Sequence, residues 1–182
     1  MKAIKSFGKI NYYNKYSLRG CENNINNSRK FVVTGENKNI LTKIGDYNYG
    51  GSICENELDK SIEEHKWRIK ILKTKEKNIM IGVAPNFDFI TKNYDTCGWY
   101  LHCYNSCLFS GPPFNYRGLK TNLKVIKDEI IVVMNIKRRA LKFIINNEDK
   151  GDSYTNIPIE KPLFPAIFLL DKDDSVSIED MN

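Results

Sequence analysis

The residues best suited to metal chemistry are crowded into one short stretch of the chain. They are thiols and one imidazole, the usual ligands of zinc, and comprise Cys97, His102, Cys103 and Cys107. A strand rises about 3.3 Å per residue, so Cys97 and Cys103 in one strand would stand roughly 20 Å apart, far beyond a single coordination shell. The cysteines also share the alternation of Trp99, which favours small side chains buried in and beside a strand. We therefore expect no zinc site here.

A histidine base, which nucleophilic catalysis would need, is available at two positions. His65 and His102 are the histidines of the chain, and alternation places His65 in the row of Trp67 and His102 on the face opposite Trp99. The sequence contains no G-x-S-x-G, no phosphate-binding G-x-x-x-x-G-K and no H-E-x-x-H pattern. We therefore expect no catalytic residue, no cofactor and no enzymatic activity.

Carboxylates suited to a cation lie together near the end of the sequence. Asp171, Asp173 and Asp174 share one short segment, and oxygen ligands of this kind suit Ca²⁺. The same residues are typical of a solvated acidic turn. Both interpretations stay open, so a metal-dependent carbohydrate or nucleotide binder, or an enzyme of that kind, is the alternative to a plain binding module.

Composition predicts one folded domain. The chain has 182 residues, of which 41% are hydrophobic and 12% aromatic, enough for one core but not for two domains. Its net charge of +6 comes from residues 1–50, which carry nine basic and three acidic side chains, so the remainder sums to zero. A nucleic-acid-binding fold usually carries its basic stripe on the folded surface, so nucleic acid is not the expected partner.

Cysteine usage and hydropathy indicate the compartment. Five cysteines, an odd number, fit reduced thiols better than a disulfide framework. The first residues lack the apolar run of a signal peptide, and no stretch reaches the ~18 apolar residues that span a bilayer. We expect a cytoplasmic monomer, with the nucleus as the alternative location, and no membrane contact.

Short apolar runs between turn residues predict an all-β protein. Residues with alternating polarity predict half-buried strands at 65–71, 99–103 and 141–145. Continuous apolar runs predict covered strands at 79–84 and 130–134. Further short strands are expected at 31–34, 40–42, 163–170 and 176–178. Together they indicate an antiparallel sandwich with little helix, preceded by a polar, basic segment of residues 1–30 that is either loosely attached or packed on the sandwich.

Three local features refine this outline. Leu58 and Ile62 stand four residues apart, which makes 55–64 the one candidate helix. Pro165 cannot donate to a sheet ladder, so it predicts a sheet edge or a bulge. Residues 146–149 predict a turn.

One loop is rich in the residue types that concentrate binding energy. It runs from Gly111 to Gly118 and contains Phe114, Tyr116 and Arg117 after two prolines that restrict the backbone. It is either a recognition loop or a rigid connection whose aromatic rings pack on the sandwich. Interleaved aromatic and basic residues also suit single-stranded nucleic acid, but one arginine is too few to track phosphates.

Five segments, in order and at matching spacings, resemble the SPRY domain family. They are HKWRIKI at 65–71, IGVA at 81–84, GWY at 98–100, LKFIINN at 141–147 and KPLFPAI at 161–167. The resemblance runs from about Phe31 to Ile178. Asn147 stands where the family usually has glycine, which is tolerable because asparagine visits the left-handed region. Arg68 stands where the family commonly has an acidic residue.

The resemblance implies a bent antiparallel β-sandwich, a concanavalin-like jelly roll formed by residues 31–182, that binds proteins and catalyses nothing. Family members typically use loops at one end of the sandwich to capture a peptide or a folded partner, as substrate-selecting modules of ubiquitin ligases or as scaffolds. Asp171 replaces the aromatic residue of a peptide-binding branch, so the Asn-containing peptide site of that branch is not carried over. We expect a partner-binding surface formed by Phe87, Phe89, Tyr94, Phe114, Tyr116, Arg117 and Asp171. Phe87 and Phe89 are alternatively core residues.

Overall fold

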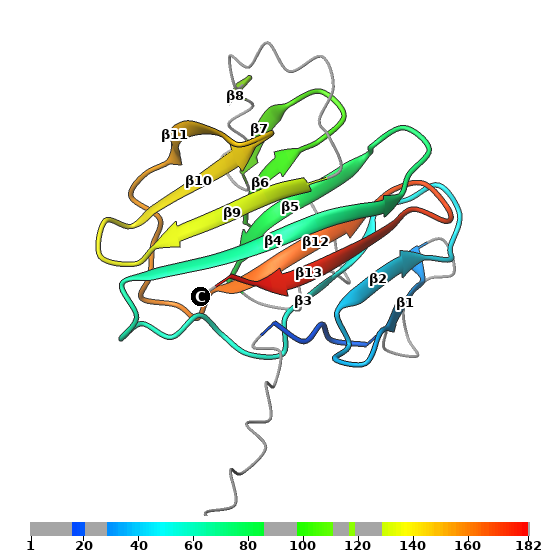
Figure 1. Ribbon diagram of the computed structural model, residues 1–182, viewed down its shortest axis with the longest axis horizontal. Helices are drawn as coiled ribbons and strands as arrows, with labels where there is room; N and C mark the ends of the chain where they lie inside the picture. Colours follow the sequence, from blue (N-terminus) through cyan, green and yellow to red (C-terminus); the bar gives the residue numbers. More distant parts are fainter. Residues whose placement is uncertain (1–15, 21–28, 86–97, 111–116, 119–128, 182) are drawn as a thin grey trace, which may run out of the picture.

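The chain folds into two antiparallel β-sheets that pack face to face (Figure 1). The computed structural model describes residues 16–20, 29–85, 98–110, 117–118 and 129–181. The seven-stranded sheet has the order β1–β2–β13–β4–β9–β10–β11. Its strands are β1 (Phe31–Thr34), β2 (Ile40–Lys43), β4 (Glu64–Lys73), β9 (Glu129–Asn135), β10 (Ala140–Ile145), β11 (Glu148–Tyr154) and β13 (Ser175–Asp180).

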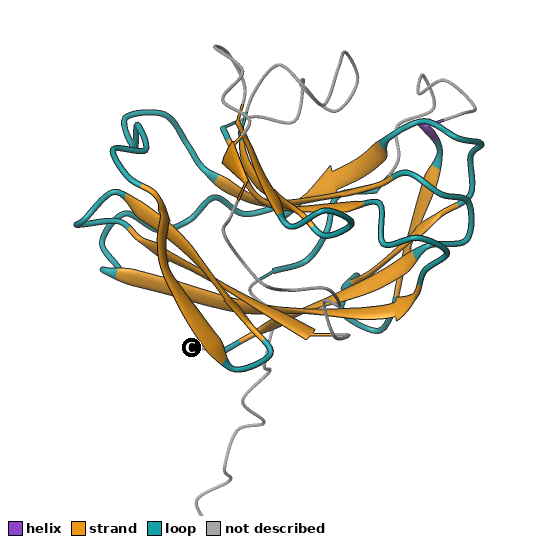
Figure 2. Cartoon of the chain, turned by 90° about the horizontal axis from the view of Figure 1, so that it is seen from above, coloured by secondary structure: helices purple, strands orange, loops and turns teal. Residues whose placement is uncertain are grey.

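The second sheet has six strands in the order β3–β12–β5–β6–β7–β8. They are β3 (Gly50–Ile53), β5 (Ile79–Ala84), β6 (Trp99–His102), β7 (Cys107–Ser110), β8 (Arg117–Gly118) and β12 (Phe164–Leu169). Seen from above, the sheets form two curved layers (Figure 2). The expected all-β, bent antiparallel sandwich with little helix is confirmed.

The alternation of β4 shows how the sequence divides the core from the surface. Trp67 and Ile69 are buried, whereas Arg68 and Lys70 between them lie on the outer face. Trp67 is 1% exposed and pairs across the ladder with Val132 of β9. A side chain of this size buried in a core contributes roughly 3–5 kcal/mol relative to alanine.

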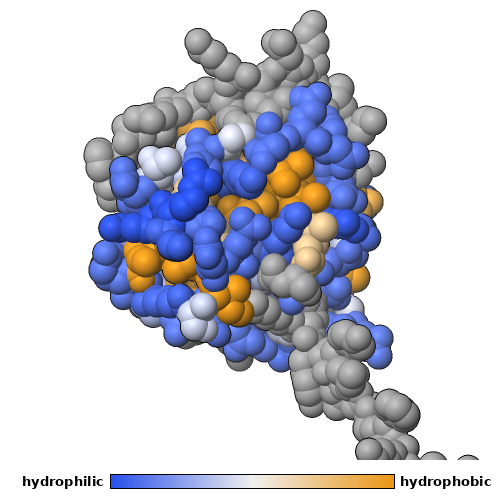
Figure 3. All heavy atoms as spheres, turned by 60° about the vertical axis from the view of Figure 1, so that its left-hand side comes forward, coloured by the Kyte–Doolittle hydropathy of each residue, from blue (hydrophilic) through white to orange (hydrophobic). Residues whose placement is uncertain are grey.

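Basic and acidic side chains form ion pairs on the outer face of the seven-stranded sheet. Arg68 Nε lies 3.1 Å from Glu129 Oε1, and Lys70 Nζ lies 2.8 Å from Glu179 Oε1. These residues come from three neighbouring strands, and each is partly exposed. Exposed pairs contribute only about 0–1 kcal/mol each, so they keep the face hydrated rather than hold it together. Hydrophilic side chains also cover most of the face drawn in Figure 3.

β6 departs from simple alternation. Leu101 is fully buried, as expected, but Tyr100 on the opposite face is fully buried too. The Tyr100 ring lies 5.4 Å from that of Phe168 and nearly perpendicular to it. Trp99 shares the face of Leu101 but is only partly buried, because it begins the strand and lines a cleft. Both faces of β6 are therefore covered, which alternation alone does not show.

The helix considered for residues 55–64 is wrong, because residues 55–63 form a loop that leads into β4 at Glu64. Leu58 is 2% exposed and its N–H donates to the Leu163 carbonyl at 2.7 Å. The Asp59 carboxylate accepts hydrogen bonds from both the N–H and the hydroxyl of Ser61. Aspartate that binds the backbone two residues onward favours a turn over a helix.

The prediction that Pro165 marks an edge or a bulge is also wrong. β12 lies between β3 and β5, and its registers show no shift. The Pro165 carbonyl accepts from the N–H of Cys54 at 2.9 Å. Because N–H and C=O of one residue point to the same side of an antiparallel strand, the missing donor faces Cys54, just beyond the end of β3 at Ile53. The ladder between β12 and β5 therefore loses no hydrogen bond.

The β10–β11 hairpin uses asparagines at its turn. Ile145 pairs with Glu148, so Asn146 and Asn147 form a two-residue loop. Their φ angles are 54° and 63°, in the left-handed region that this turn requires. The expected turn and the role given to Asn147 agree with this geometry.

Residues 16–20 lie against the sandwich. Tyr16 is 1% exposed, with its ring 5.6 Å from that of Trp67, and Leu18 is fully buried and forms a bridge with Cys54. The Tyr16 hydroxyl lies 3.5 Å from His65 Nδ1. Part of the polar leading segment thus supplies core side chains.

Candidate functional site

Most of the residues expected to contact a partner lie outside the described ranges. These are Phe87, Phe89, Tyr94, Phe114 and Tyr116. Arg117 begins β8, and its backbone pairs with Leu108 of β7. The assignment of these positions to a binding surface stays a prediction.

Asp171, the remaining predicted contact, does not reach the surface. It is 3% exposed, and the Asn78 amide donates to its carboxylate at 3.0 Å. A carboxylate removed from water needs such a donor, because burying a charge without a partner costs several kcal/mol. Asp171 therefore joins the start of β5 to the β12–β13 loop and is not a surface contact.

The acidic segment of the β12–β13 loop is only partly a solvated turn. Asp173 is exposed and lies 3.5 Å from Lys73 Nζ. Asp174 is 1% exposed, and one of its carboxylate oxygens accepts from the Lys75 N–H at 2.9 Å. Burial raises the pKa of Asp174. Within the described ranges, no three His, Cys, Asp or Glu side chains come close enough to share a metal ion.

Two of the three described cysteines are packed in the core. Cys54 and Cys103 are buried, which raises the pKa of both thiols, that of Cys103 to about 12. A thiol with a raised pKa is a poor nucleophile near neutral pH because the thiolate is the reactive form. Cys107 is partly exposed, whereas Cys21 and Cys97 lie outside the described residues.

Both histidines connect loops to strands. His65 is fully buried, with Nε2 at 2.8 Å from the Asp59 carbonyl. His102 Nε2 lies 3.1 Å from the Tyr49 hydroxyl, and burial lowers its pKa. These contacts fix the positions of the rings.

A cleft of about 360 Å³ lies where the edge strand β11 reaches over the six-stranded sheet. One wall is formed by Trp99 at the start of β6 and Ser110 at the end of β7. The other is formed by residues 152–156, at the end of β11 and in the loop that follows. The Tyr154 hydroxyl donates to the Tyr100 carbonyl at 2.8 Å, which ties the two walls together.

The cleft places polar residues beside an aromatic ring. The Ser153 hydroxyl oxygen is buried and has no hydrogen-bond partner among the described residues. Because this oxygen has no solvent contact, a ligand would meet the other polar groups of the lining. Trp99 is partly exposed, and Thr155 and Asn156 are exposed at the same cleft. An indole and polar groups arranged in this way suit a peptide.

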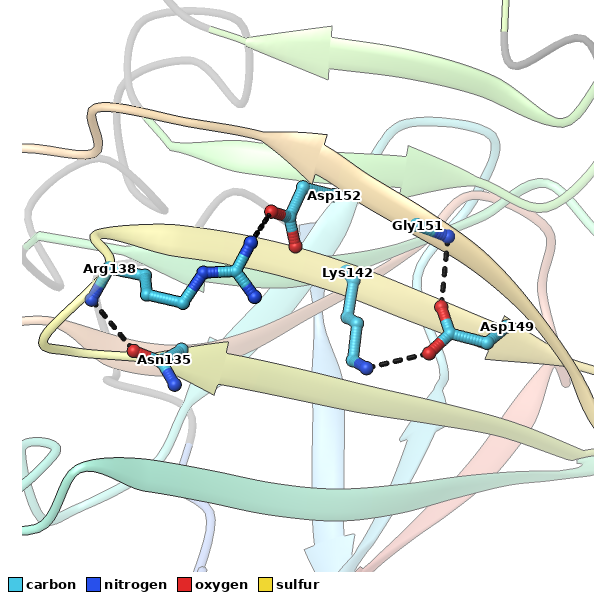
Figure 4. Close-up of polar contacts among 6 residues, drawn as sticks. All are labelled: Asn135, Arg138, Lys142, Asp149, Gly151 and Asp152. Atoms are coloured by element: carbon cyan, nitrogen blue, oxygen red, sulfur yellow. Dashed lines mark hydrogen bonds and ion pairs between the residues drawn. The ribbon is translucent and has the colours of Figure 1, made fainter.

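Asp152, the one charged residue among the described residues that line the cleft, is already paired. Figure 4 shows its carboxylate against the guanidinium of Arg138, from the β9–β10 turn. Beside it, Lys142 Nζ lies 2.6 Å from one oxygen of Asp149, and the Gly151 N–H donates to the other oxygen at 2.8 Å. Lys142 first, and then Gly151, lower the pKa of Asp149. Among the described residues, these four side chains on this side of the cleft therefore form two ion pairs.

Chain connectivity relates the predicted binding loops to this cleft. Ser110 directly precedes segment 111–116, and Trp99 follows segment 86–97 after one residue. Trp99 pairs with Ser110 on one side and with Val83 on the other. Both segments are thus attached at the end of the six-stranded sheet that forms the cleft.

Residues 152–156 were missed by sequence reasoning. The turn expected at 146–149 implies a strand after it, so the sequence could have predicted that β11 exists. Its two register shifts against β10, and the sheet over which it reaches, depend on contacts far apart in the sequence. No local pattern marks Ser153 as a buried hydroxyl.

The fold and the cleft define a curved two-sheet β-sandwich with a concave site at one end. The family model for the SPRY domain matches residues 64–181, and the chain belongs to this family. The resemblance seen in the five sequence segments is thereby confirmed. SPRY domains are generally protein-interaction modules and typically bind protein partners.

Solved structures of SPRY domains share the fold. The SPRY domain of human HERC1 is 21% identical, with a TM-score of 0.64 over 84% of this chain and 93% of that chain. The PSpry domain of TRIM65 is 10% identical, with a TM-score of 0.62 over 91% and 92%. A further human SPRY domain is 14% identical, with a TM-score of 0.61 over 82% and 94%.

No curated protein sequence matches the chain. Among the described residues, no helix has the length and apolar character needed to cross a membrane.

Proposed function

We propose that the chain is a non-enzymatic module that captures a peptide, or a loop of a folded partner, in the cleft between Trp99 and residues 152–156. The observation that carries the proposal is the partly exposed indole of Trp99 in a cleft whose opposite wall carries the exposed polar residues Thr155 and Asn156. An aromatic anchor and a few polar groups in one concavity are typical of recognition sites.

The adjoining segments extend this proposed surface. Phe87, Phe89 and Tyr94 precede Trp99, and Phe114 and Tyr116 follow Ser110. Aromatic side chains attached next to the wall formed by Trp99 and Ser110 would enlarge the buried contact beyond a cleft of this volume. We further propose that the module is cytoplasmic and monomeric. It would act as a substrate-recognition domain or as a scaffold domain.

The test compares partner capture by the full chain and by Trp99→Ala. Proteins enriched from a cell extract by the wild-type chain are expected to be lost, or reduced about tenfold or more, with Trp99→Ala. Leu72→Ala is the matched control, since Leu72 is also a large hydrophobic residue, 53% exposed, but lies on β4. Far-ultraviolet circular dichroism checks that each variant folds.

The triple variant Phe114→Ala, Tyr116→Ala, Arg117→Ala tests the adjoining segment separately. If the same partners bind Trp99→Ala as they bind the wild type, the cleft is not the binding site. If they are lost only with the triple variant, the surface lies in the loop and not in the cleft.

A further inference from the structure

The wall of the cleft that faces Trp99 is attached less firmly than the core of the sandwich. We call this wall, residues 151–156 at the end of β11 and in the loop that follows, the strap. β11 is the outermost strand of its sheet, and its ladder with β10 contains two register shifts. The strap residues are exposed or only partly buried, whereas Ile157 directly after them is fully buried. An edge segment with few buried side chains opens at a lower free energy than the core.

Both ends of the strap have backbone conformations suited to a hinge. Gly151 has a φ of 74° and Asn156 a φ of 59°. Glycine and asparagine adopt this left-handed region more readily than other residues, so these two positions can absorb a change of chain direction. Beyond the strap, the Ile157 N–H donates to the Arg139 carbonyl at 3.0 Å, and Arg139 Nε donates to the Ile157 carbonyl at 2.9 Å. The chain is therefore fixed again directly after the second hinge.

A hydrogen bond between the two sheets favours the closed position of the strap. The Tyr154 hydroxyl donates to the Tyr100 carbonyl at 2.8 Å. Tyr100 is fully buried, with its ring 5.4 Å from that of Phe168, so the acceptor belongs to the core. The ion pair of Asp152 with Arg138 joins the strap to the β9–β10 turn of its own sheet, and it does not connect the strap to the six-stranded sheet (Figure 4). We call the hydrogen bond from Tyr154 to Tyr100 the latch.

The residue next to the latch favours the open position. The Ser153 hydroxyl oxygen is buried and has no hydrogen-bond partner among the described residues. A hydroxyl that has lost its water without gaining a partner raises the free energy of the closed state, and opening would return it to water. One hydrogen bond gained and one hydroxyl left without a partner have effects of similar size and opposite sign. Adjacent residues that oppose each other in this way favour an equilibrium between two positions.

We propose that the strap opens and closes over Trp99, with the hydrogen bond from Tyr154 to Tyr100 as its latch and the Ser153 hydroxyl as the group that weakens the closed state. The open strap admits a segment of the partner to the cleft, and the closed strap holds that segment against the indole. This inference concerns the regulation of the cleft and rests on the function proposed for it.

The experiment measures acrylamide quenching of Trp99 fluorescence in the free, full chain. The chain has two tryptophans, so Trp67→Phe as the background leaves Trp99 as the sole emitter. Tyr154→Phe keeps the ring but removes the latch hydroxyl, which should shift the equilibrium toward the open strap about two- to tenfold and raise the quenching constant. Ser153→Ala removes the hydroxyl without a partner and should lower the quenching constant. A general loss of stability would raise quenching in both variants, so opposite changes are specific to the strap.

Two variants far from the cleft serve as matched controls. Tyr47→Phe removes the hydroxyl of a tyrosine that is 73% exposed, and Ser61→Ala removes a hydroxyl bonded to Asp59. Neither should change the quenching of Trp99. Hydrogen exchange of residues 148–156, measured by mass spectrometry in chains that keep Trp67, provides a second readout that does not depend on the Trp67→Phe background. Exchange should be faster in Tyr154→Phe and slower in Ser153→Ala.

Unchanged quenching and exchange in Tyr154→Phe, or an increase of both in Ser153→Ala, would overturn the proposal. Neither measurement needs a partner, so this result is separate from that of partner capture. If Trp99→Ala loses its partners but the strap variants behave like the wild type, the cleft binds with a fixed wall. If the strap variants change as expected but Trp99→Ala keeps its partners, the strap moves without controlling access to a binding site, and the proposed regulation is wrong.

Discussion

At the residue scale, several polar side chains that look like surface groups in the sequence are core components. Lys43 and Asp171 are both buried, and each has a specific hydrogen-bond partner. Burial lowers the pKa of Lys43 to about 8. Such groups are retained where a donor and an acceptor meet at a defined point, which only the fold supplies.

The effect of burying a carboxylate can be tested at Asp174 by measuring the free energy of unfolding at two pH values. Burial raises its pKa above the ordinary 3.8, so the unfolded chain releases this proton first as pH rises. The residue therefore favours unfolding above about pH 4 and has no such effect below it. Asp174→Asn, which keeps an acceptor for the Lys75 N–H, should unfold with a higher free energy than the wild type at pH 7. The difference should shrink toward zero near pH 3, as measured by urea denaturation at both values.

The matched control is Asp173→Asn, because the Asp173 side chain is 63% exposed and its ion pair with Lys73 is screened by water. It should change the free energy of unfolding by less than about 0.5 kcal/mol at either pH. An Asp174→Asn variant that is less stable than the wild type at pH 7 would show that the charge is favourable where it stands.

At the element scale, the residues of a turn affect the stability of the strands that it joins. The β10–β11 hairpin shows this clearly. Asn147 has a φ of 63°, which alanine adopts at a cost of about 1–2 kcal/mol. Asn147→Ala should therefore lower the free energy of unfolding by about 1 kcal/mol, whereas Asn147→Gly should leave it unchanged or raise it slightly. Chemical denaturation of the three proteins checks this. Equal stabilities of the alanine and glycine variants would mean that the turn relaxes to another form.

The segment that contains Tyr16 provides a second prediction at this scale. Tyr16 is 1% exposed against Trp67, so Tyr16→Ala should lower the free energy of unfolding by about 3–5 kcal/mol. Tyr47→Ala, at a tyrosine that is 73% exposed, should cost less than about 0.5 kcal/mol. Similar costs for the two variants would show that residues 16–20 are not needed by the core.

At the scale of the whole molecule, the two sheets share one core, which predicts that they unfold together. Trp67 lies in the seven-stranded sheet and Trp99 in the six-stranded sheet. Trp99→Phe leaves the first as the sole tryptophan, and Trp67→Phe leaves the second. In each variant the fluorescence transition in urea should coincide with the transition seen by circular dichroism. A fluorescence midpoint that differs from the circular dichroism midpoint in either variant would indicate that one sheet unfolds alone.

The candidate site was predictable only in part. Alternation and turn residues located most strands, because burial on one face imposes a period of two. The segment at 50–53 was missed since Gly50, Gly51 and Ser52 carry no strand pattern, and it is ordered by pairing with β12. The cleft depends on β11 meeting β6 and β7, a contact that local sequence does not encode.

By itself, the sequence determined the class of fold, the inward row of β4 with Trp67, the asparagine turn of β10–β11, and membership of a family of binding modules. The first three follow from short-range rules of side-chain period and backbone preference, and the family follows from the resemblance of five segments to the SPRY domain. The tertiary structure decided that Asp171 is buried, that Pro165 lies in an interior strand, and that Trp99, Ser110 and residues 152–156 line one cleft. Those outcomes depend on which strands pack together, and packing joins residues that no local pattern relates.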